Sequence, residues 1–427
     1  MTTGADRSLA VLEAYPISHR TFGGWRDEVL NIGIGNEFSA SGTAKVINLD
    51  AAANTAPTEE VIEAVIAALR SGAANPASAH ELGDRSRAIL TRARDSVLSL
   101  ITGAEEEGVT FTSGCTEANN TVFAGVAATT VITSTVEHPS VLRAAVRSSS
   151  IGATLHYLPV DRAGIVDLDR FETLVTGARG PLLVSIQYAN SETGVIQPIK
   201  EIAALLATRP MTTFHSDAAQ AFGKLAIDLS PGVGPDLVTV SGHKLHAPMG
   251  IGAIVAAGRG VSLVPLLVGG DQEGALRAGT EAVPLIAGFG AACNKRADGL
   301  SKSVDQMKAL RDRLEAALRA AIPDVRLGAA AERLPNISSV RFPGIDGMSL
   351  IAQLDSRGVA ASQGSACASR RPEPSHVLIA MGLSESEAFE TVRFSLSVLS
   401  TETEIDEAVS IIAGSVEHLR SVAWTRA

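Results

Sequence analysis

The chain has 427 residues, more than the roughly 250 to 300 at which a single hydrophobic core stops growing, so we expect at least two lobes. Hydrophobic residues make up 45% and charged residues 19%, which excludes a disordered, collagen-like or coiled-coil chain. A formal net charge of −10 argues against direct nucleic-acid binding, because phosphate backbones attract basic surfaces. We find neither an apolar run of the roughly 18 residues that suggest a membrane span nor a secretory signal, and we expect a cytoplasmic protein.

The cysteine content bears on both compartment and chemistry. Three cysteines are too few for a disulfide framework, so we expect each to be a reduced thiol. Cys367 lies among small and polar residues in GSACASRRPEP, where Arg370 and Arg371 favour its thiolate. Cys115 and Cys293 have apolar neighbours, and we expect them to be buried, poorly nucleophilic thiols.

The first 45 residues are interrupted by glycines and are interpreted as an N-terminal extension of unknown role. From residue 46 the pattern becomes regular, and Pro57 and Thr58 open a predicted helix. Short apolar runs then alternate with helical patterns, and seven of them are predicted strands: GVTFTSG, TVITST, ATLHYLPV, PLLVSIQ, MTTFHSD, DLVTVSG and GIGAIVAA. This alternation predicts an α/β large domain over residues 46–290 with a mostly parallel sheet.

Residues 291–427 have a different pattern and are predicted to form a smaller α+β domain. We expect helices over Gln306–Ala320, Gly347–Arg357 and Pro374–Met381, with strands in NISSVRF, GVAASQGS and TVRFSLS. The last helix begins with a capping box made by Thr401 and Glu404.

Ligands of parallel sheets bind outside the carboxyl ends of the strands, so the residues just after each apolar run are the ones to inspect. Lys244 follows Ser241, Gly242 and His243 at the end of one run. A lysine in this place is usually a solvated surface charge. Here Ser241 and His243 could bind a phosphate, and a buried amine with a lowered pKa could form a Schiff base with a carbonyl compound.

Two further strand ends carry polar groups. Asp217 and Gln220 follow TFHS, where the carboxylate could either favour the start of a helix or keep a pyridine nitrogen protonated. Thr116 and Glu117 follow a glycine that opens a helix, which is a candidate anion site. Each signal is weak when taken alone.

Together these elements resemble the class V aminotransferase superfamily of pyridoxal phosphate enzymes, and within it the NifS/IscS-like cysteine desulfurases. The resemblance covers about Asn48 to Leu419 in ten ordered motifs: NLDAAANTAP, NPASAHELG, FTSGCTEANN, VEHPSV, NSETGVIQPI, HSDAAQAFGK, SGHK, GGDQEGALRAGT, SQGSACAS and VRFSLS. SGHK, GSACAS and VRFSLS are the specific part. The resemblance implies the fold of aspartate aminotransferase-like transferases that depend on pyridoxal 5'-phosphate (PLP).

The resemblance also implies roles for individual residues. Lys244 resembles the lysine that binds the cofactor covalently, Asp217 the partner of its pyridine nitrogen, and Cys367 the nucleophile that takes sulfur. The remaining matches have these implied roles: Gln220 near the phenolic oxygen; His138 stacked on the ring and able to carry a proton; Thr116, Ser241 and His243 at the phosphate; Thr280 reaching the phosphate of the other subunit in a homodimer; and Arg393 at the substrate carboxylate.

One departure from the family pattern concerns the phenolic contact. Similar proteins usually have an asparagine three residues before the glycine of NSETG, whereas this chain has Ser191 there, preceded by Asn190. Asn190 either substitutes for the missing amide or the contact is weaker. The opening NLDAAANTAP also has no polar side chain directly after Asp50.

The resemblance implies that L-cysteine is converted to L-alanine, with a persulfide on Cys367 that passes to an acceptor protein such as an iron-sulfur scaffold. Two alternatives stay open. The chain could be another class V lyase or aminotransferase, or it could be a scaffold that keeps the fold without turnover. The sequence leaves the sulfur acceptor unidentified.

Overall fold

The computed structural model describes residues 46–72, 74–258, 261–328, 331–364 and 373–424. The predicted N-terminal extension and Cys367 therefore lie outside the described residues. In the described part of the chain, no helix combines the length and the apolar character that crossing a membrane requires.

The larger lobe is built on a seven-stranded sheet with the strand order β3-β10-β9-β7-β6-β4-β5. β10 is antiparallel to both of its neighbours, and the other pairings are parallel. Each of the seven predicted strands is confirmed, and their bounds are Ala104–Thr112 (β3), Thr130–Ser134 (β4), Thr154–Leu158 (β5), Leu182–Ser185 (β6), Thr212–Asp217 (β7), Leu237–Ser241 (β9) and Gly252–Ala257 (β10). The fold is therefore the α/β class expected from the alternating pattern.

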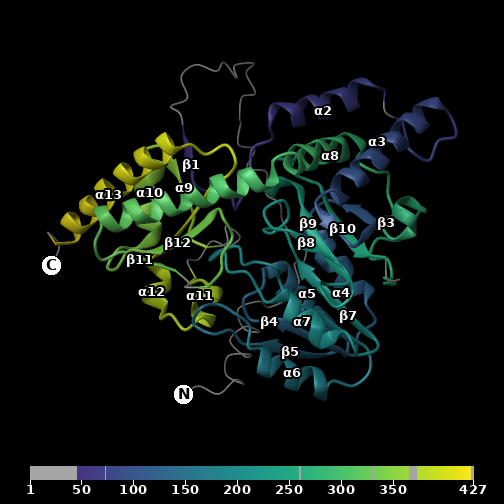
Figure 1. Ribbon diagram of the computed structural model, residues 1–427, viewed down its shortest axis with the longest axis horizontal. Helices are drawn as coiled ribbons and strands as arrows, with labels where there is room; N and C mark the ends of the chain where they lie inside the picture. The colour runs from purple at the N-terminus through teal and green to yellow at the C-terminus, as the bar shows by residue number, and fades with distance from the viewer. Residues whose placement is uncertain (1–45, 73, 259–260, 329–330, 365–372, 425–427) are drawn as a thin grey trace, which may run out of the picture.

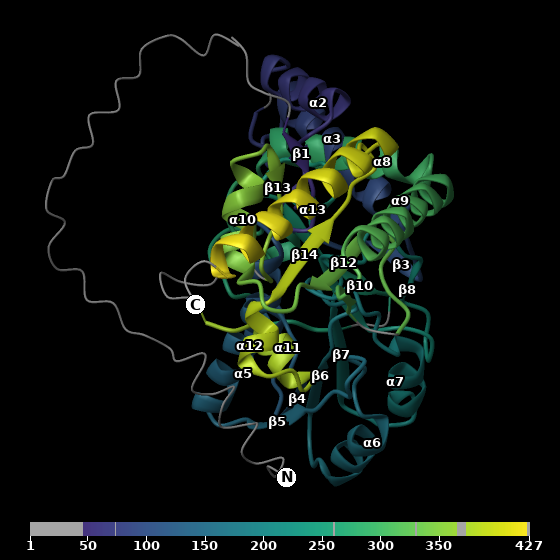
Figure 2. The same ribbon diagram turned by 90° about the vertical axis from the view of Figure 1, so that its left-hand side faces the viewer.

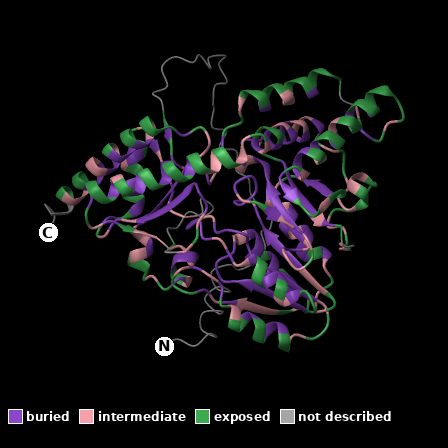
Figure 3. Cartoon of the chain, in the orientation of Figure 1, coloured by how far each residue is buried: buried purple, intermediate pink, exposed green. Residues whose placement is uncertain are grey.

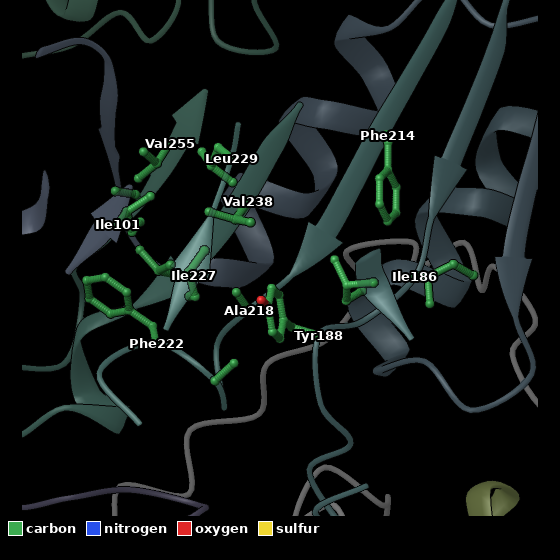
Figure 4. Close-up of a cluster of buried hydrophobic side chains, with 14 of the residues drawn as sticks. Ile101, Ile186, Tyr188, Phe214, Ala218, Phe222, Ile227, Leu229, Val238 and Val255 are labelled. Carbon is green, nitrogen blue, oxygen red and sulfur yellow. The ribbon is translucent and has the colours of Figure 1, made fainter. Parts of the chain in front are cut away.

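Helices cover both faces of this sheet, because successive side chains of a strand point to opposite faces. Leu237 packs with α4 and α5, whereas the next residue, Val238, packs in the cluster that contains α3, α6, α7 and α8. Figure 4 shows side chains of this second cluster, among them Phe214, Val238 and Val255. The helices of this lobe are Glu59–Arg70 (α2), Glu81–Leu98 (α3), Cys115–Gly125 (α4), Pro139–Ser150 (α5), Leu168–Gly177 (α6), Ile199–Leu206 (α7) and Val283–Ala297 (α8).

The smaller lobe packs three helices against short strands, to one side of the large sheet (Figure 1). Its helices are Leu300–Ala321 (α9), Gly347–Asp355 (α10) and Glu402–Trp424 (α13), and its strands are Ile47–Asn48 (β1), Arg326–Leu327 (β11), Ile337–Arg341 (β12), Val359–Ala360 (β13) and Thr391–Ser395 (β14). β11, β12 and β14 form an antiparallel sheet, and β1 pairs with β13 in parallel. Figure 2 shows α10, α13 and β14 side by side.

Several local expectations for the smaller lobe are confirmed. The capping box forms, since Thr401 and Glu404 exchange hydrogen bonds between side chain and backbone. The helix expected over Pro374–Met381 is shorter, His376–Ala380 (α11), because the Ser375 side chain caps its first turn. Outward-facing helix surfaces are exposed while the sheets are buried (Figure 3).

Two packing features bear on the division into domains. α8 passes residue 290 without interruption and packs against α2 and α3 of the larger lobe. Ile47 of β1 belongs to the hydrophobic core of the smaller lobe, and so does Leu49, the residue that follows β1. The boundary between residues 290 and 291 stays a prediction.

The remaining short elements connect these parts. They are Ile101–Thr102 (β2) paired with Ile227–Asp228 (β8), the 3-10 helices Gly242–Lys244 (η1) and Gln272–Ala275 (η2), and Glu385–Phe389 (α12).

Candidate active site

A cavity of about 450 Å³ lies at the edge of the sheet where the strands of the parallel set end. This is the edge at which ligands of parallel sheets bind. Both lobes contribute to its wall. Its polar lining residues include Ser113, Thr116, Glu117, His138, Ser140, Gln187, Ser191, Asp217, Gln220, Ser241, His243, Lys244 and Arg393.

Lys244 lies on η1, directly after β9, so its side chain is fixed by a strand end rather than by a long loop. Its Nζ donates hydrogen bonds to the carbonyl oxygens of Ala52 and Ala53, each at 2.6 Å. These two carbonyls belong to the turn after β1, so the amine bridges the lobes. The amine is therefore presented to the cavity at a defined position.

Asp217 is the last residue of β7 and is 8% exposed. Its Oδ1 accepts a hydrogen bond from the Ala219 backbone N–H at 3.0 Å, and its Oδ2 accepts one from Asn119 Nδ2 at 2.8 Å. A buried carboxylate that is held by donors on both oxygens is suited to face a cationic group of a ligand.

His138 caps the N-terminus of α5 and lines the same cavity. Its Nδ1 accepts a hydrogen bond from the Ser140 backbone N–H at 3.2 Å. Burial lowers the pKa of His138, which favours the neutral imidazole.

The start of α4 lines the cavity with the first turn of a helix. Gly114 caps this helix with φ 149°, a conformation that favours glycine, and Thr116 lies in the first turn. A Cβ on Gly252 would lie 2.8 Å from the Cα of Gly114, so only a glycine lets β10 come this close. Exposed amide N–H groups and the helix dipole favour a phosphate here.

Ser241 and His243 lie at the end of β9 and also line the cavity. The Ser241 hydroxyl and His243 Nδ1 are 2.9 Å apart. Burial, together with the charge of Lys244, lowers the pKa of His243 to about 4. A phosphate would thus meet two hydroxyls and an imidazole near the helix terminus.

Gln220 follows Asp217 and contributes an amide to the wall. Its Nε2 donates to the Ala52 carbonyl at 2.9 Å, whereas its buried Oε1 has no hydrogen-bond partner in the described part of the chain. Buried polar atoms are nearly always satisfied, so an orphaned acceptor in a cavity wall indicates that a polar ligand or water completes the site.

Arg393 on β14 is a cationic residue that the smaller lobe contributes to the cavity. It is 3% exposed. Nη2 donates to Asp50 Oδ1 at 2.7 Å, and Nη1 donates to the Ser191 carbonyl at 2.9 Å. Nε is buried without a partner among the described residues. The fork is therefore oriented before any carboxylate binds.

Asn190 does not line the cavity, and its amide is bonded to its own turn and to the segment after β4, so its contact with the cofactor stays a prediction. Its Oδ1 accepts hydrogen bonds from the backbone N–H groups of Glu192 and Thr193, each at 2.9 Å, and Nδ2 donates to the Val136 carbonyl at 3.0 Å. Ser191 is the residue of this turn that lines the cavity.

Three polar residues at the site are not among those predicted from the sequence. Gln187 lines the cavity just past β6, and the strand-end rule could have found it. Asn119 and Ser140 occur in the motifs FTSGCTEANN and VEHPSV, but no pattern in the sequence indicates which of their neighbours they bond.

Thr280 and the cysteines differ in where they lie relative to the cavity. Thr280 lies outside this cavity and lines a neighbouring one of about 190 Å³. Cys115 lines the main cavity with Sγ 3.5 Å from Asp217 Oδ1, and burial together with this carboxylate raises the pKa of its thiol well above the usual range. Burial does the same for Cys293 in α8. Cys367 lies outside the described residues.

Comparison with known proteins agrees with this geometry. Residues 47–408 match the family model described as Aminotransferase class-V. A cysteine desulfurase of Trichormus azollae is 40% identical over 384 residues, which cover 88% of this chain and 94% of the relative.

Solved structures of similar proteins have the same fold. A NifS-like protein superimposes with a TM-score of 0.80 at 32% identity, covering 88% of this chain and 100% of the other. A structure of SspA in complex with cysteine superimposes with a TM-score of 0.71 at 31% identity, covering 84% and 100%. The chain therefore belongs to the class V aminotransferase family and, within it, to the cysteine desulfurases.

Proposed function

We propose that this protein is an L-cysteine desulfurase that converts L-cysteine to L-alanine and holds the sulfur as a persulfide on Cys367. The observation that carries the proposal is the convergence of Lys244, Asp217 and Arg393 on one cavity of about 450 Å³. An amine, a buried carboxylate and a guanidinium are the groups that recognise, respectively, a carbonyl, a cationic ring nitrogen and a substrate carboxylate.

Enzymes of this family depend on pyridoxal 5'-phosphate. The cavity fits that group, because the amine of Lys244, the buried carboxylate of Asp217 and the glycine-capped start of α4 all line it. Lys244 would hold the cofactor covalently, Asp217 would face its ring nitrogen, and Gln220 its phenolic oxygen. The other holding residues would be Thr116, Ser241 and His243 at the phosphate and His138 on the ring face. When bound, the cofactor supplies an electrophilic carbon and a ring that accepts electrons.

The protein's own groups account for the remaining requirements. Arg393 binds the substrate carboxylate in a fixed orientation, and Lys244 moves the proton of the substrate Cα. The thiolate of Cys367 attacks the substrate sulfur, so that the substrate Cβ–S bond breaks and an S–S bond forms. The substrate Cβ gains a proton, which gives alanine. Cys115 and Cys293 are poor candidates for this attack because burial raises the pKa of each thiol.

We further propose a homodimer in which Thr280 of one protomer reaches the phosphate in the cavity of its partner. In support, Thr280 does not line the main cavity of its own chain. The segment before it carries exposed apolar side chains, with Val264 62% and Val268 80% exposed. Exposed apolar side chains that gather in one segment are typical of protein interfaces.

We also propose the acceptor of the sulfur and the compartment of the reaction. Sulfur would pass from Cys367 to an acceptor protein, such as one that assembles iron-sulfur clusters, and the enzyme would act in the cytoplasm. A composition with only three cysteines is consistent with a reducing compartment.

The experiment is to incubate the cofactor-loaded protein with L-cysteine, quantify alanine and sulfide, and locate the persulfide by alkylation and peptide mass spectrometry. Alanine in step with a persulfide on the Cys367 peptide is the expected result. Sulfide without a protein persulfide would favour a lyase. A protein that binds no cofactor and forms no alanine would favour a scaffold.

A further inference from the structure

Asn119 on α4 connects two residues of the cavity that belong to different strand ends. It is fully buried, at 0% exposure. Its Nδ2 donates to Asp217 Oδ2 at 2.8 Å and to Ser140 Oγ at 2.9 Å. Its Oδ1 accepts from Thr239 Oγ1 at 2.6 Å. The amide therefore joins the carboxylate of Asp217 to the Ser140 hydroxyl, which itself lies 2.7 Å from His138 Nδ1.

The direction of each bond on the His138 side follows from a single backbone group. The Ser140 backbone N–H can only donate, and it points to His138 Nδ1, so Nδ1 carries no proton. The Ser140 hydroxyl must then also donate to Nδ1. Because that hydroxyl has given its only proton, its oxygen accepts from Asn119 Nδ2. The carboxylate of Asp217, an acceptor, independently requires the same orientation of the Asn119 amide.

The hydrogen bonds on the Thr239 side of Asn119 also have a fixed direction. Thr239 gives its proton to Asn119 Oδ1, so its oxygen accepts from His215 Nε2 at 3.1 Å. His215 Nδ1 then accepts from the Ser185 hydroxyl at 2.9 Å. Thr239, His215 and Ser185 are all 0% exposed, and burial lowers the pKa of His215 to about 4, in agreement with a neutral ring. The donor and acceptor roles are thus consistent along the whole series of buried hydrogen bonds from His138 to Ser185.

We propose that Asn119 is a positioning residue that fixes Asp217 and His138 through one hydrogen-bond chain, and that His138 is held as a neutral imidazole with its proton on Nε2. The proposal rests on the proposed function only in assigning Asp217 and His138 to the cofactor cavity.

This arrangement restricts what His138 can do. A proton on Nδ1 would displace two donors, so the ring does not act as a base through that nitrogen. Nε2 has no partner in the described part of the chain, and it carries the hydrogen that His138 can donate to a bound ligand. Burial is the largest influence on the pKa of His138 and lowers it. The charges of Lys244 and His376 also disfavour the imidazolium. The carboxylates of Asp217 and Glu192 favour the imidazolium, but their effect is smaller than that of burial. We infer a hydrogen-bond donor rather than a proton acceptor.

The direct test is nitrogen NMR of the full-length, cofactor-loaded protein labelled with ¹⁵N-histidine, in which His138→Gln identifies the His138 signals. We expect a protonated Nε2 and an unprotonated Nδ1 from pH 6 to 9. A protonated Nδ1, or a ring that becomes cationic near pH 6.5, would overturn the proposal. The measurement does not depend on turnover, so a protein that makes no alanine but shows this tautomer would refute the proposed function alone.

The second test replaces the Asn119 amide, whose Nδ2 donates two hydrogen bonds, with a carboxylate that can only accept. Asn119→Asp keeps the oxygen that Thr239 bonds but removes both donated hydrogen bonds and adds a negative charge. We expect the dissociation constant for pyridoxal phosphate to rise at least about tenfold, which corresponds to about 1.4 kcal/mol, and the His138 signals to titrate at a higher pH.

The matched control for this exchange is Asn120→Asp on the same helix, because the Asn120 side chain donates to the Thr116 carbonyl one turn earlier and to no other described residue. It should keep both the affinity and the His138 spectrum. Equal effects of the two variants would show that Asn119 does not position the site. If Asn119→Asp fails to fold, the spectrum of the unaltered protein still decides whether the proton of His138 lies on Nε2.

Discussion

The guanidinium of Arg393 and the carboxylate of Asp50 form an ion pair at 2.7 Å, although 343 positions separate the two residues. The pair forms because Asp50 makes a β-bridge with Ser395 of β14, two positions after Arg393 in the same strand. The Ser191 carbonyl holds the other outer nitrogen. An arginine that is fixed on both sides has little conformational freedom to lose when a substrate carboxylate binds.

Arg393→Lys should therefore raise the KM for L-cysteine at least about tenfold while the absorption of the bound cofactor is kept, since an ammonium cannot reproduce the two-pronged contact. Steady-state kinetics and a visible spectrum measure both quantities. Arg313→Lys makes the same exchange at an exposed ion pair with Asp406 and serves as the control. An unchanged KM in the Arg393 variant would remove this residue from the substrate site.

Lys244→Ala should abolish the covalent link to the cofactor and lower turnover by about a thousandfold or more, because the amine is both the attachment point and the proton carrier. Borohydride reduction followed by mass spectrometry detects the link. The exposed Lys308, which pairs with Asp312, provides a control as Lys308→Ala. A reducible link that persists in the Lys244 variant would show that another lysine binds the cofactor.

Cys367→Ser should keep the bound cofactor and the binding of L-cysteine but form no persulfide. The reason is that the hydroxyl is a far weaker nucleophile than a thiolate, and the other two thiols have raised pKa values. Cys293→Ala is the control and should turn over normally. Extra sulfur on Cys115, or normal turnover of the Cys367 variant, would contradict the proposed mechanism.

Asn190→Ala and Ser191→Ala should have different kinds of effect. Asn190 holds its turn together, so its loss should lower the free energy of unfolding by about 1 to 3 kcal/mol. Ser191 lines the cavity, so its loss should change cofactor or substrate affinity with little effect on stability. Urea unfolding and cofactor titration separate the two. A stable Asn190 variant with weakened cofactor binding would reverse our assignment.

We predict that the buried carboxyl of Glu137 gives the free energy of unfolding an unusual pH dependence. Burial raises the pKa of this carboxyl to about 8, above its ordinary value of 4.5. The folded protein therefore holds a proton that the unfolded chain releases, and stability falls as the pH rises between these values, by about 1.4 kcal/mol per pH unit for one proton.

Glu137→Gln removes this titration, so urea unfolding of the variant should depend less on pH between 5 and 8 than that of the unaltered protein. Groups common to both proteins cancel in the comparison. Parallel pH curves for the two proteins would show that Glu137 is ionised in the folded state.

The strands and several site residues could be predicted from local sequence. Runs of six to eight residues between turn residues predict all seven strands, because a buried strand needs apolar side chains on both faces. Since strands of one direction end at one edge, Lys244 and Asp217 were expected to lie together, and both line the same cavity.

Tertiary structure alone decided which polar neighbours meet. Asn190 and Ser191 are adjacent polar residues in an irregular turn, where no periodicity sets side-chain direction, and only the fold turns Ser191 toward the cavity. The bonds of Asn119 to Ser140 and Asp217 likewise join separate strand ends across 21 and 98 positions. Hydrogen bonds and ion pairs of this kind depend on distances of about 3 Å between groups that only the packing of sheet and helices brings together.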